Sequence, residues 1–169
     1  MMQIQLENGL KRSWIVLLLA AGLGACSHPA FRDGLDFMAA GKKDEGVASL
    51  EKAARDRPRD AEIKAAMIRH KGETIDSYLD DADRQRAAGK MEAADAAYRR
   101  ALGIDGRNTR ALQGLEQLAV DRKNAAQLAQ AEQLLKKGDL LGAERVVRTV
   151  RAQDTLNPLA RSLQQQIDR

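Results

Sequence analysis

A repeat with a period of 48 to 49 residues constrains the fold of this chain more than any other feature of its sequence. Three segments open with a glycine, at Gly41, Gly89 and Gly138. A tiny residue follows five positions later, a bulky residue nine positions later, and a small or β-branched residue twelve positions later. These positions are Gly46, Leu50 and Ala53 in the first segment, Ala94, Tyr98 and Ala101 in the second, and Ala143, Val147 and Val150 in the third. Internal repeats of this length indicate stacked helical units rather than one globular core.

The spacing predicts a helical hairpin in each segment. The glycine would end one helix, because only a residue without a Cβ adopts the left-handed conformation at low cost. The next helix would begin two or three residues later, with Asp139 as the N-cap of the third copy. The tiny residue would let the two helices approach closely, and the bulky residue would fill the adjacent layer of their interface. Pro58 would end the first hairpin, because proline cannot continue a helix.

The segments that lead into the later hairpins carry a helical apolar face. Its residues are Ile75, Tyr78, Leu79 and Ala82 before the second glycine, and Leu128, Ala131 and Leu135 before the third. We expect Asp80, Asp81 and Asp83 to form a solvated face, and Gly72 to kink or split its helix. In the first copy we assign Phe31, Leu35 and Met38 to the core. Aromatic residues make up only 3% of the chain, which disfavours a β-sandwich.

These features resemble tetratricopeptide (TPR) repeats. The first copy has Gly34 and Phe37 where the first helix of a TPR places its glycine and tyrosine, and the pattern continues in register through Gly41, Leu50, Ala53 and Pro58. The later copies replace the first pair with Ala82 and Gln85, and with Ala131 and Leu134. Their first helices are also longer than a repeat of about 34 residues allows. The resemblance therefore implies an all-α, TPR-like α-solenoid of about three degenerate, lengthened hairpins.

The start of the chain carries the pattern of an export signal. Lys11 and Arg12 precede an apolar run from Trp14 to Leu23, which is too short to cross a bilayer, since a spanning helix needs about 20 residues. Leu23, Gly24 and Ala25 then precede Cys26, the only cysteine of the chain. This order resembles the lipobox of bacterial lipoproteins, in which the cysteine becomes the acylated first residue. The alternative is a plain signal peptide followed by an unpaired cysteine, a liability in an oxidising compartment.

The expected organisation is a signal peptide over residues 1–25, a lipidated tether over 26–30, and TPR-like repeats over 31–158. Residues 159–169 would form a terminal helix that either caps the array or belongs to a further repeat. In lipoproteins of this type, the serine that follows the cysteine implies sorting to the outer membrane, with the mature chain on its periplasmic side. Two or three acyl chains would make that anchor effectively permanent.

No catalytic or metal-binding constellation emerges from the sequence. The two histidines, His28 and His70, lack a partner at metal-ligand spacing, and Gly41-Lys42 lacks the rest of a phosphate-binding loop. Arg145, Arg148 and Arg151 run along one predicted helix face, either as a docking stripe for an acidic partner or, as we favour, as a solvated face. The net charge of +4 gives no strong argument for nucleic acid. We therefore expect no enzyme, no cofactor, no metal and no nucleic-acid partner.

The order of these features also resembles the lipoprotein N-terminal region of some secretins of type II secretion and type IV pilus systems. The residues that carry it are the lipobox, His28-Pro29-Ala30-Phe31-Arg32, and Gly89-Lys90-Met91-Glu92-Ala93-Ala94. It implies a protein-interaction module at the outer membrane, and an oligomer if the chain is part of a secretin. The alternative is a free-standing TPR lipoprotein, such as a pilotin-like or outer-membrane assembly factor. A periplasmic enzyme is a third, disfavoured class.

Overall fold

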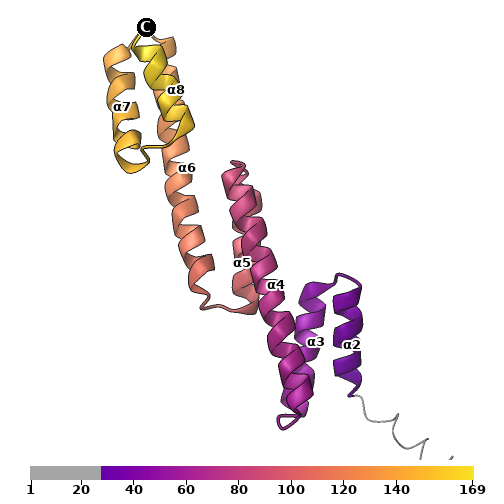
Figure 1. Ribbon diagram of the computed structural model, residues 1–169. Coiled ribbons are helices and arrows are strands. Elements are labelled where there is room, and N and C mark those ends of the chain that lie inside the picture. The colour runs from indigo at the N-terminus through magenta and orange to yellow at the C-terminus, as the bar shows by residue number, and fades with distance from the viewer. Residues whose placement is uncertain (1–27) are drawn as a thin grey trace, which may run out of the picture. The chain divides into compact units, whose positions relative to one another are not determined.

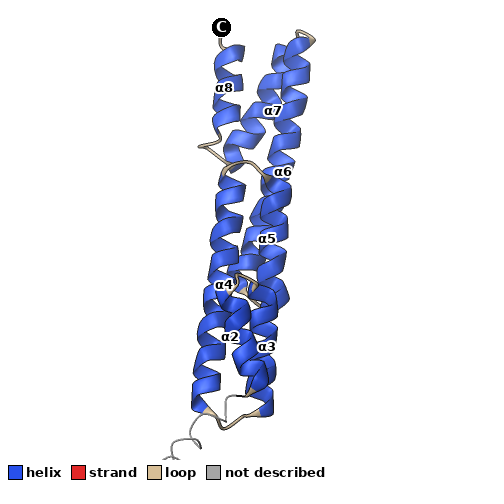
Figure 2. Cartoon of the chain, turned by 90° about the vertical axis from the view of Figure 1, so that its right-hand side faces the viewer, coloured by secondary structure: helices blue, strands red, loops and turns tan. Residues whose placement is uncertain are grey.

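The computed structural model describes residues 28–169, and this part of the chain is helical without a strand (Figures 1 and 2). The helices are α2 (Pro29–Ala39), α3 (Lys43–Asp56), α4 (Ala61–Ala87), α5 (Met91–Ile104), α6 (Thr109–Lys136), α7 (Leu140–Gln153) and α8 (Pro158–Ile167). The prediction of an all-α fold is confirmed for these residues. The expected signal peptide lies outside them, as do residues 26 and 27 of the expected tether, within whose range α2 already begins at Pro29.

The same glycine turn joins three helix pairs: α2 to α3, α4 to α5, and α6 to α7. Gly41, Gly89 and Gly138 have φ angles of 75°, 73° and 81°. Each glycine amide donates to the carbonyl three residues before it, at 3.0 Å, and the next amide donates to the carbonyl five residues before itself, at 2.9 Å. This pair of bonds is a Schellman motif, which satisfies carbonyls left free at a helix end. The predicted turns are therefore present, and they repeat in their hydrogen bonds.

The turns that follow α3, α5 and α7 also repeat. In each, the first residue after the helix donates its amide to the carbonyl four residues earlier, in the bonds of Arg57 to Ala53, Asp105 to Ala101 and Asp154 to Val150. The next helix then receives a side-chain cap. Asp60 accepts from the Ile63 amide at 3.2 Å, and Asn108 and Asn157 accept from the amides three residues on at 3.0 Å. Asp139 caps α7 as predicted, accepting from the Gly142 amide at 2.9 Å.

Two compact units divide the chain between Thr74 and Ile75, so that α4 contributes its first half to one unit and its second half to the other. In the first unit α2 and α3 interlock through two glycines. A Cβ on Gly34 would lie 2.8 Å from Leu50 Cγ, and a Cβ on Gly46 would lie 2.9 Å from Met38 Cγ. The absence of both side chains lets the helices pack at this distance. Leu50 is fully buried between them.

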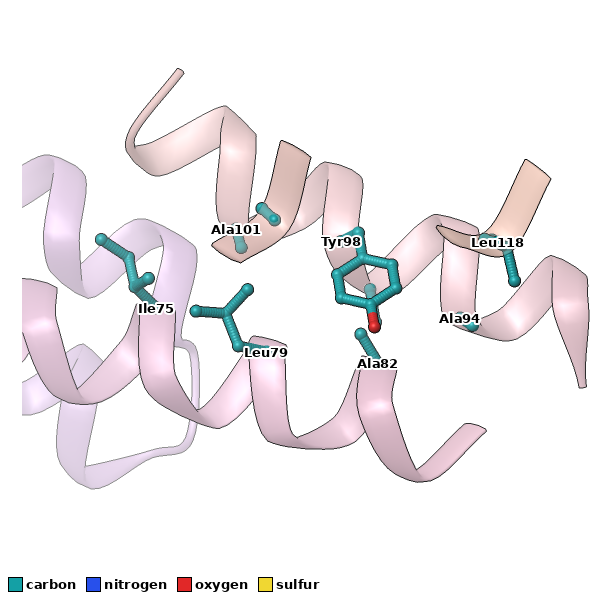
Figure 3. Packing of buried hydrophobic residues seen from close by; sticks show 9 residues of the cluster. Ile75, Leu79, Ala82, Ala94, Tyr98, Ala101 and Leu118 are labelled. Carbon is teal, nitrogen blue, oxygen red and sulfur yellow. The ribbon is translucent and has the colours of Figure 1, made fainter. Parts of the chain in front are cut away.

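The second unit contains two apolar clusters that share α6. The first cluster joins the second half of α4, α5 and the start of α6 around Tyr98, Leu79 and Leu118. Figure 3 shows Ile75, Leu79 and Ala82 of α4 facing Ala101, Tyr98 and Ala94 of α5. The second cluster joins the end of α6 to α7 and α8, and contains Leu128, Ala131, Val147, Val150, Ala160 and Leu163. The tiny and bulky positions identified in the sequence are thus buried in both clusters.

One of the two alternatives for Gly72 is wrong. Gly72 does not split its helix, because α4 runs without interruption from Ala61 to Ala87. The apolar face of α8 is partly covered. Leu163 is only 2% exposed, because α8 packs back against α6 and α7, whereas Leu159 stays 40% exposed.

Replacing Gly89 by alanine should lower the free energy of unfolding by about 1 kcal/mol, because a Cβ is disfavoured at positive φ. Gly72→Ala is the matched control. It lies inside α4, where a Cβ would meet nothing within 4 Å, so the same change should raise stability by about 0.5–1 kcal/mol. Urea unfolding followed by circular dichroism at the helical band measures both. Equal effects of the two substitutions would contradict the turn geometry.

Candidate interaction surfaces

A groove on the first unit lies between α2 and α4 and has a volume of about 460 Å³. We call it the α2–α4 groove; its lining residues are Leu35, Met38, Ala39, Lys43, His70, Glu73 and Thr74. Leu35 and Met38 are half-buried here rather than enclosed in the core, which corrects their assignment. The reason is that α2 turns Gly34, not these larger residues, toward Leu50. Their apolar surface is left available to a partner.

Three of the polar residues of the α2–α4 groove stand along α4, and the fourth, Lys43, is the first residue of α3. His70 Nδ1 lies 3.1 Å from Glu73 Oε2, one turn further along the helix, and Thr74 is buried beside them. An apolar wall facing a histidine–carboxylate pair can seat one or two apolar side chains and accept or donate hydrogen bonds at the rim. The sequence assigned no role to His70 and did not predict this groove. The sequence shows that His70 and Glu73 lie one helical turn apart, but it does not show that residues of α2 line the same groove.

A network of hydrogen bonds and ion pairs links α4 to α6 in the second unit. Arg110 donates to Asp80 at 2.9 Å and to Asp83 at 2.6 Å, and the Tyr98 hydroxyl also donates to Asp83. Further along, Arg86 donates to Asp121 at 2.9 Å. The side chains of Asp80 and Asp83 remain partly exposed, as the sequence predicted, but they also have partners on other helices. They serve as acceptors for α5 and α6 side chains, so this acidic cluster positions helices.

This network of hydrogen bonds and ion pairs changes the pKa of Asp83. Burial alone would raise the pKa of its carboxyl, but the hydrogen bonds from Tyr98 and Arg110 and the charges of Arg110 and Arg86 outweigh burial. The pKa of Asp83 therefore lies below its ordinary value of 3.8. On the other side of the bond, burial and the Asp83 contact raise the pKa of Tyr98. The pair is thus held as a neutral phenol donating to a carboxylate at neutral pH.

The lowered pKa of Asp83 predicts a loss of stability in acid. A carboxyl with a lower pKa in the folded state than in the unfolded state stabilises the fold at pH values above its unfolded pKa. That contribution is lost as the pH falls through the folded pKa. We expect Asp83→Asn to be less stable than the parent at pH 7, and the difference to shrink as the pH falls below about 4. Unfolding midpoints measured in urea from pH 7 to pH 2.5 test this; a difference that stays constant with pH would contradict it.

The α7 arginines are exposed, as the favoured interpretation of a solvated face expects. Arg148 pairs with Glu144 one turn earlier, and all three of Arg145, Arg148 and Arg151 are exposed. Isolated pairs of this kind on a helix surface contribute little stability. His28, to which the sequence assigned no role, places Nε2 3.3 Å from Asp56 Oδ2 and so links the start of α2 to the end of α3.

The predicted lipidation site, Cys26, and the lipobox residues Leu23, Gly24 and Ala25 lie outside the described residues. Within residues 28–169, no group of three or more histidine, cysteine or acidic side chains could hold a metal ion. No helix in the same part of the chain is both long and apolar enough to cross a membrane. No protein-family model matches this chain, and no curated protein matches it either.

Proposed function

We propose that this chain is a TPR-like protein-interaction module, held at the periplasmic face of the outer membrane by a lipid on Cys26. The observation that carries the proposal is the threefold recurrence of the same hairpin, with a Schellman glycine before its second helix and small and bulky buried positions inside it. Stacked helical hairpins present extended surfaces, and proteins of this architecture use them to bind other proteins. The α2–α4 groove is such a surface. The module has no turnover of its own.

In this proposal the partner belongs to a protein-secretion or pilus machine, and the chain corresponds to the N-terminal region of a secretin. A tether at the membrane raises the effective concentration of the groove for partners at the same membrane, so a modest affinity suffices. The support is the order of features in the sequence: an export signal, a lipobox and then helical repeats.

A free-standing TPR lipoprotein, such as a pilotin-like or outer-membrane assembly factor, is the second candidate. In the described residues, Ala160 and Leu163 of α8 cover the α6–α7 hairpin. Both candidates share the anchored, protein-binding role and differ in the assembly that the module serves.

The proposal is tested in cells that produce the chain from its own gene. Cys26→Ala should abolish acylation and move the protein out of the membrane fraction, while Ser27→Ala should leave it anchored. Deletion of the gene segment should impair secretion or piliation, and restoring the wild-type segment should rescue it. Unchanged membrane retention of the Cys26 variant would refute the anchor. Normal secretion and piliation after deletion would refute the assignment to these machines.

A further inference from the structure

A second groove on the first unit lies between α3 and the first half of α4, and has a volume of about 580 Å³. We call it the α3–α4 groove; its lining residues are Glu51, Ala54, Arg55, Lys64, Met67, Ile68 and Lys71. It shares none of these residues with the α2–α4 groove. Its composition is also different, because apolar residues alternate with cations rather than with a histidine–carboxylate pair.

Ile68 is the principal apolar feature of this groove. It is 65% exposed, although α4 buries Ile63 and Ala66 on its other side. A single exposed isoleucine needs no explanation by itself. Here, however, half-buried Met67 and Ala54 lie in the same groove and extend the apolar surface. Lys64 and Lys71 stand one turn before and after Ile68 on the same helix.

The charge of the groove is positive. Its one carboxylate, Glu51, accepts a hydrogen bond from Lys71 Nζ at 2.6 Å and lies 3.9 Å from Arg55 Nη1. Glu51 is thus the shared ion-pair partner of Lys71 and Arg55. No ion pair with a described carboxylate engages Lys64, which is exposed beside Ile68. The groove thus combines apolar residues with three cations and only one carboxylate. Such a surface is complementary to a ligand that combines apolar side chains with carboxylates.

We propose that the α3–α4 groove docks an acidic amphipathic helix of a partner protein. One or two apolar side chains of that helix would cover Ile68 and Met67, and carboxylates on either side would pair with Lys64 and Arg55. This is helix-in-groove recognition, in which apolar anchors recur at three- and four-residue steps. The groove between α3 and α4 suits such a peptide better than an anionic membrane, which would meet a flat basic surface better. The proposal deepens the protein-binding function proposed above by naming the chemistry of a partner.

The direct test measures binding of a defined peptide to the full chain in detergent micelles. The probe is a fluorescein-labelled, amidated helix of about 16 residues, with leucine at three- and four-residue steps and glutamate at most other positions. A second peptide carries lysine in place of glutamate, and phosphatidylglycerol vesicles replace the peptide in a third arm. Fluorescence anisotropy should show binding of the acidic peptide that weakens with added salt, and much weaker binding of the basic one.

Two variants and two matched controls locate the site. Ile68→Asp and Lys64→Glu should each weaken acidic-peptide binding by about tenfold, because they remove the apolar anchor and reverse a rim charge. Leu156→Asp and Lys123→Glu make the same changes at exposed positions of the second unit and should leave binding unchanged. Circular dichroism should show that all four variants remain folded, since all four sites are exposed.

Three results would overturn the proposal. They are equal binding of the acidic and basic peptides, equal effects of the site variants and their controls, or vesicle binding that depends on Ile68 while the acidic peptide fails to bind. This test does not depend on the secretion assay. Peptide binding that requires Ile68 would stand even if deletion left secretion and piliation normal. Conversely, loss of secretion on deletion would stand even if the peptide did not bind.

Discussion

Replacing Tyr98 by alanine is expected to lower the free energy of unfolding by about 3–5 kcal/mol, the range for removing a large buried ring. Tyr98 is 1% exposed and is the largest fully buried side chain of the described residues. Its ring lies within the cluster that α4, α5 and α6 form (Figure 3). Several neighbours in this cluster are alanines, including Ala82 and Ala94, which cannot extend into the space that the ring leaves. The cavity would therefore persist.

Tyr98→Phe is the matched control, because it keeps the ring and removes only the hydroxyl bound to Asp83. It should cost about 1 kcal/mol, since Asp83 retains its bonds from Arg110. Urea unfolding of the two variants, followed by circular dichroism, separates the packing contribution from the hydrogen bond. If phenylalanine and alanine destabilised the chain equally, the ring would not be packed as the structure has it.

Gly114→Val is expected to lower the free energy of unfolding by about 3 kcal/mol, the upper end of the usual cost of overpacking. Gly114 lies on α6, and a Cβ at this position would overlap the ring of Tyr98. That ring is fully buried and cannot move aside without displacing α4 or α5. The small gain in helix propensity from glycine to valine, a few tenths of a kcal/mol, does not offset the overlap.

Gly103→Val provides the comparison for Gly114→Val. Gly103 lies on α5, and a Cβ there would meet nothing within 4 Å. Its replacement should change stability by less than about 0.5 kcal/mol, as surface substitutions usually do. Melting midpoints of the two variants measure the difference. A small effect at Gly114, similar to that at Gly103, would show that α5 and α6 are further apart at this point than described.

The all-α fold and its hairpin turns could be predicted because their causes are local. Gly41, Gly89 and Gly138 end helices through a backbone conformation that depends on one residue. The cap at Asp139 likewise acts over three residues. The buried positions Leu50, Tyr98 and Val147 follow from the periodicity of each helix, which a short window of sequence contains.

The candidate surfaces could be predicted only in part. The sequence predicted neither groove, because both lie on the first unit and depend on α2 and α3 packing against α4. Ile68 falls outside the buried positions Ile63 and Ala66 of its own helix. This position of Ile68, away from the buried face of α4, was the sequence feature that could have indicated the groove. It indicates an exposed apolar residue but not which charged residues surround it.

By itself, the sequence determined the glycine turns at Gly41, Gly89 and Gly138 and the buried positions that follow each turn. These properties come from backbone preferences and from side chains a few residues apart. Tertiary structure alone decided that Asp83 would accept from Tyr98 and Arg110, that the Tyr98 ring would pack against Gly114, and that Leu163 of α8 would be buried against α6 and α7. The physical reason is distance along the chain. Tyr98 and Arg110 lie 15 and 27 residues from Asp83 and become its partners only when separate helices pack together. Local backbone preferences do not determine that packing.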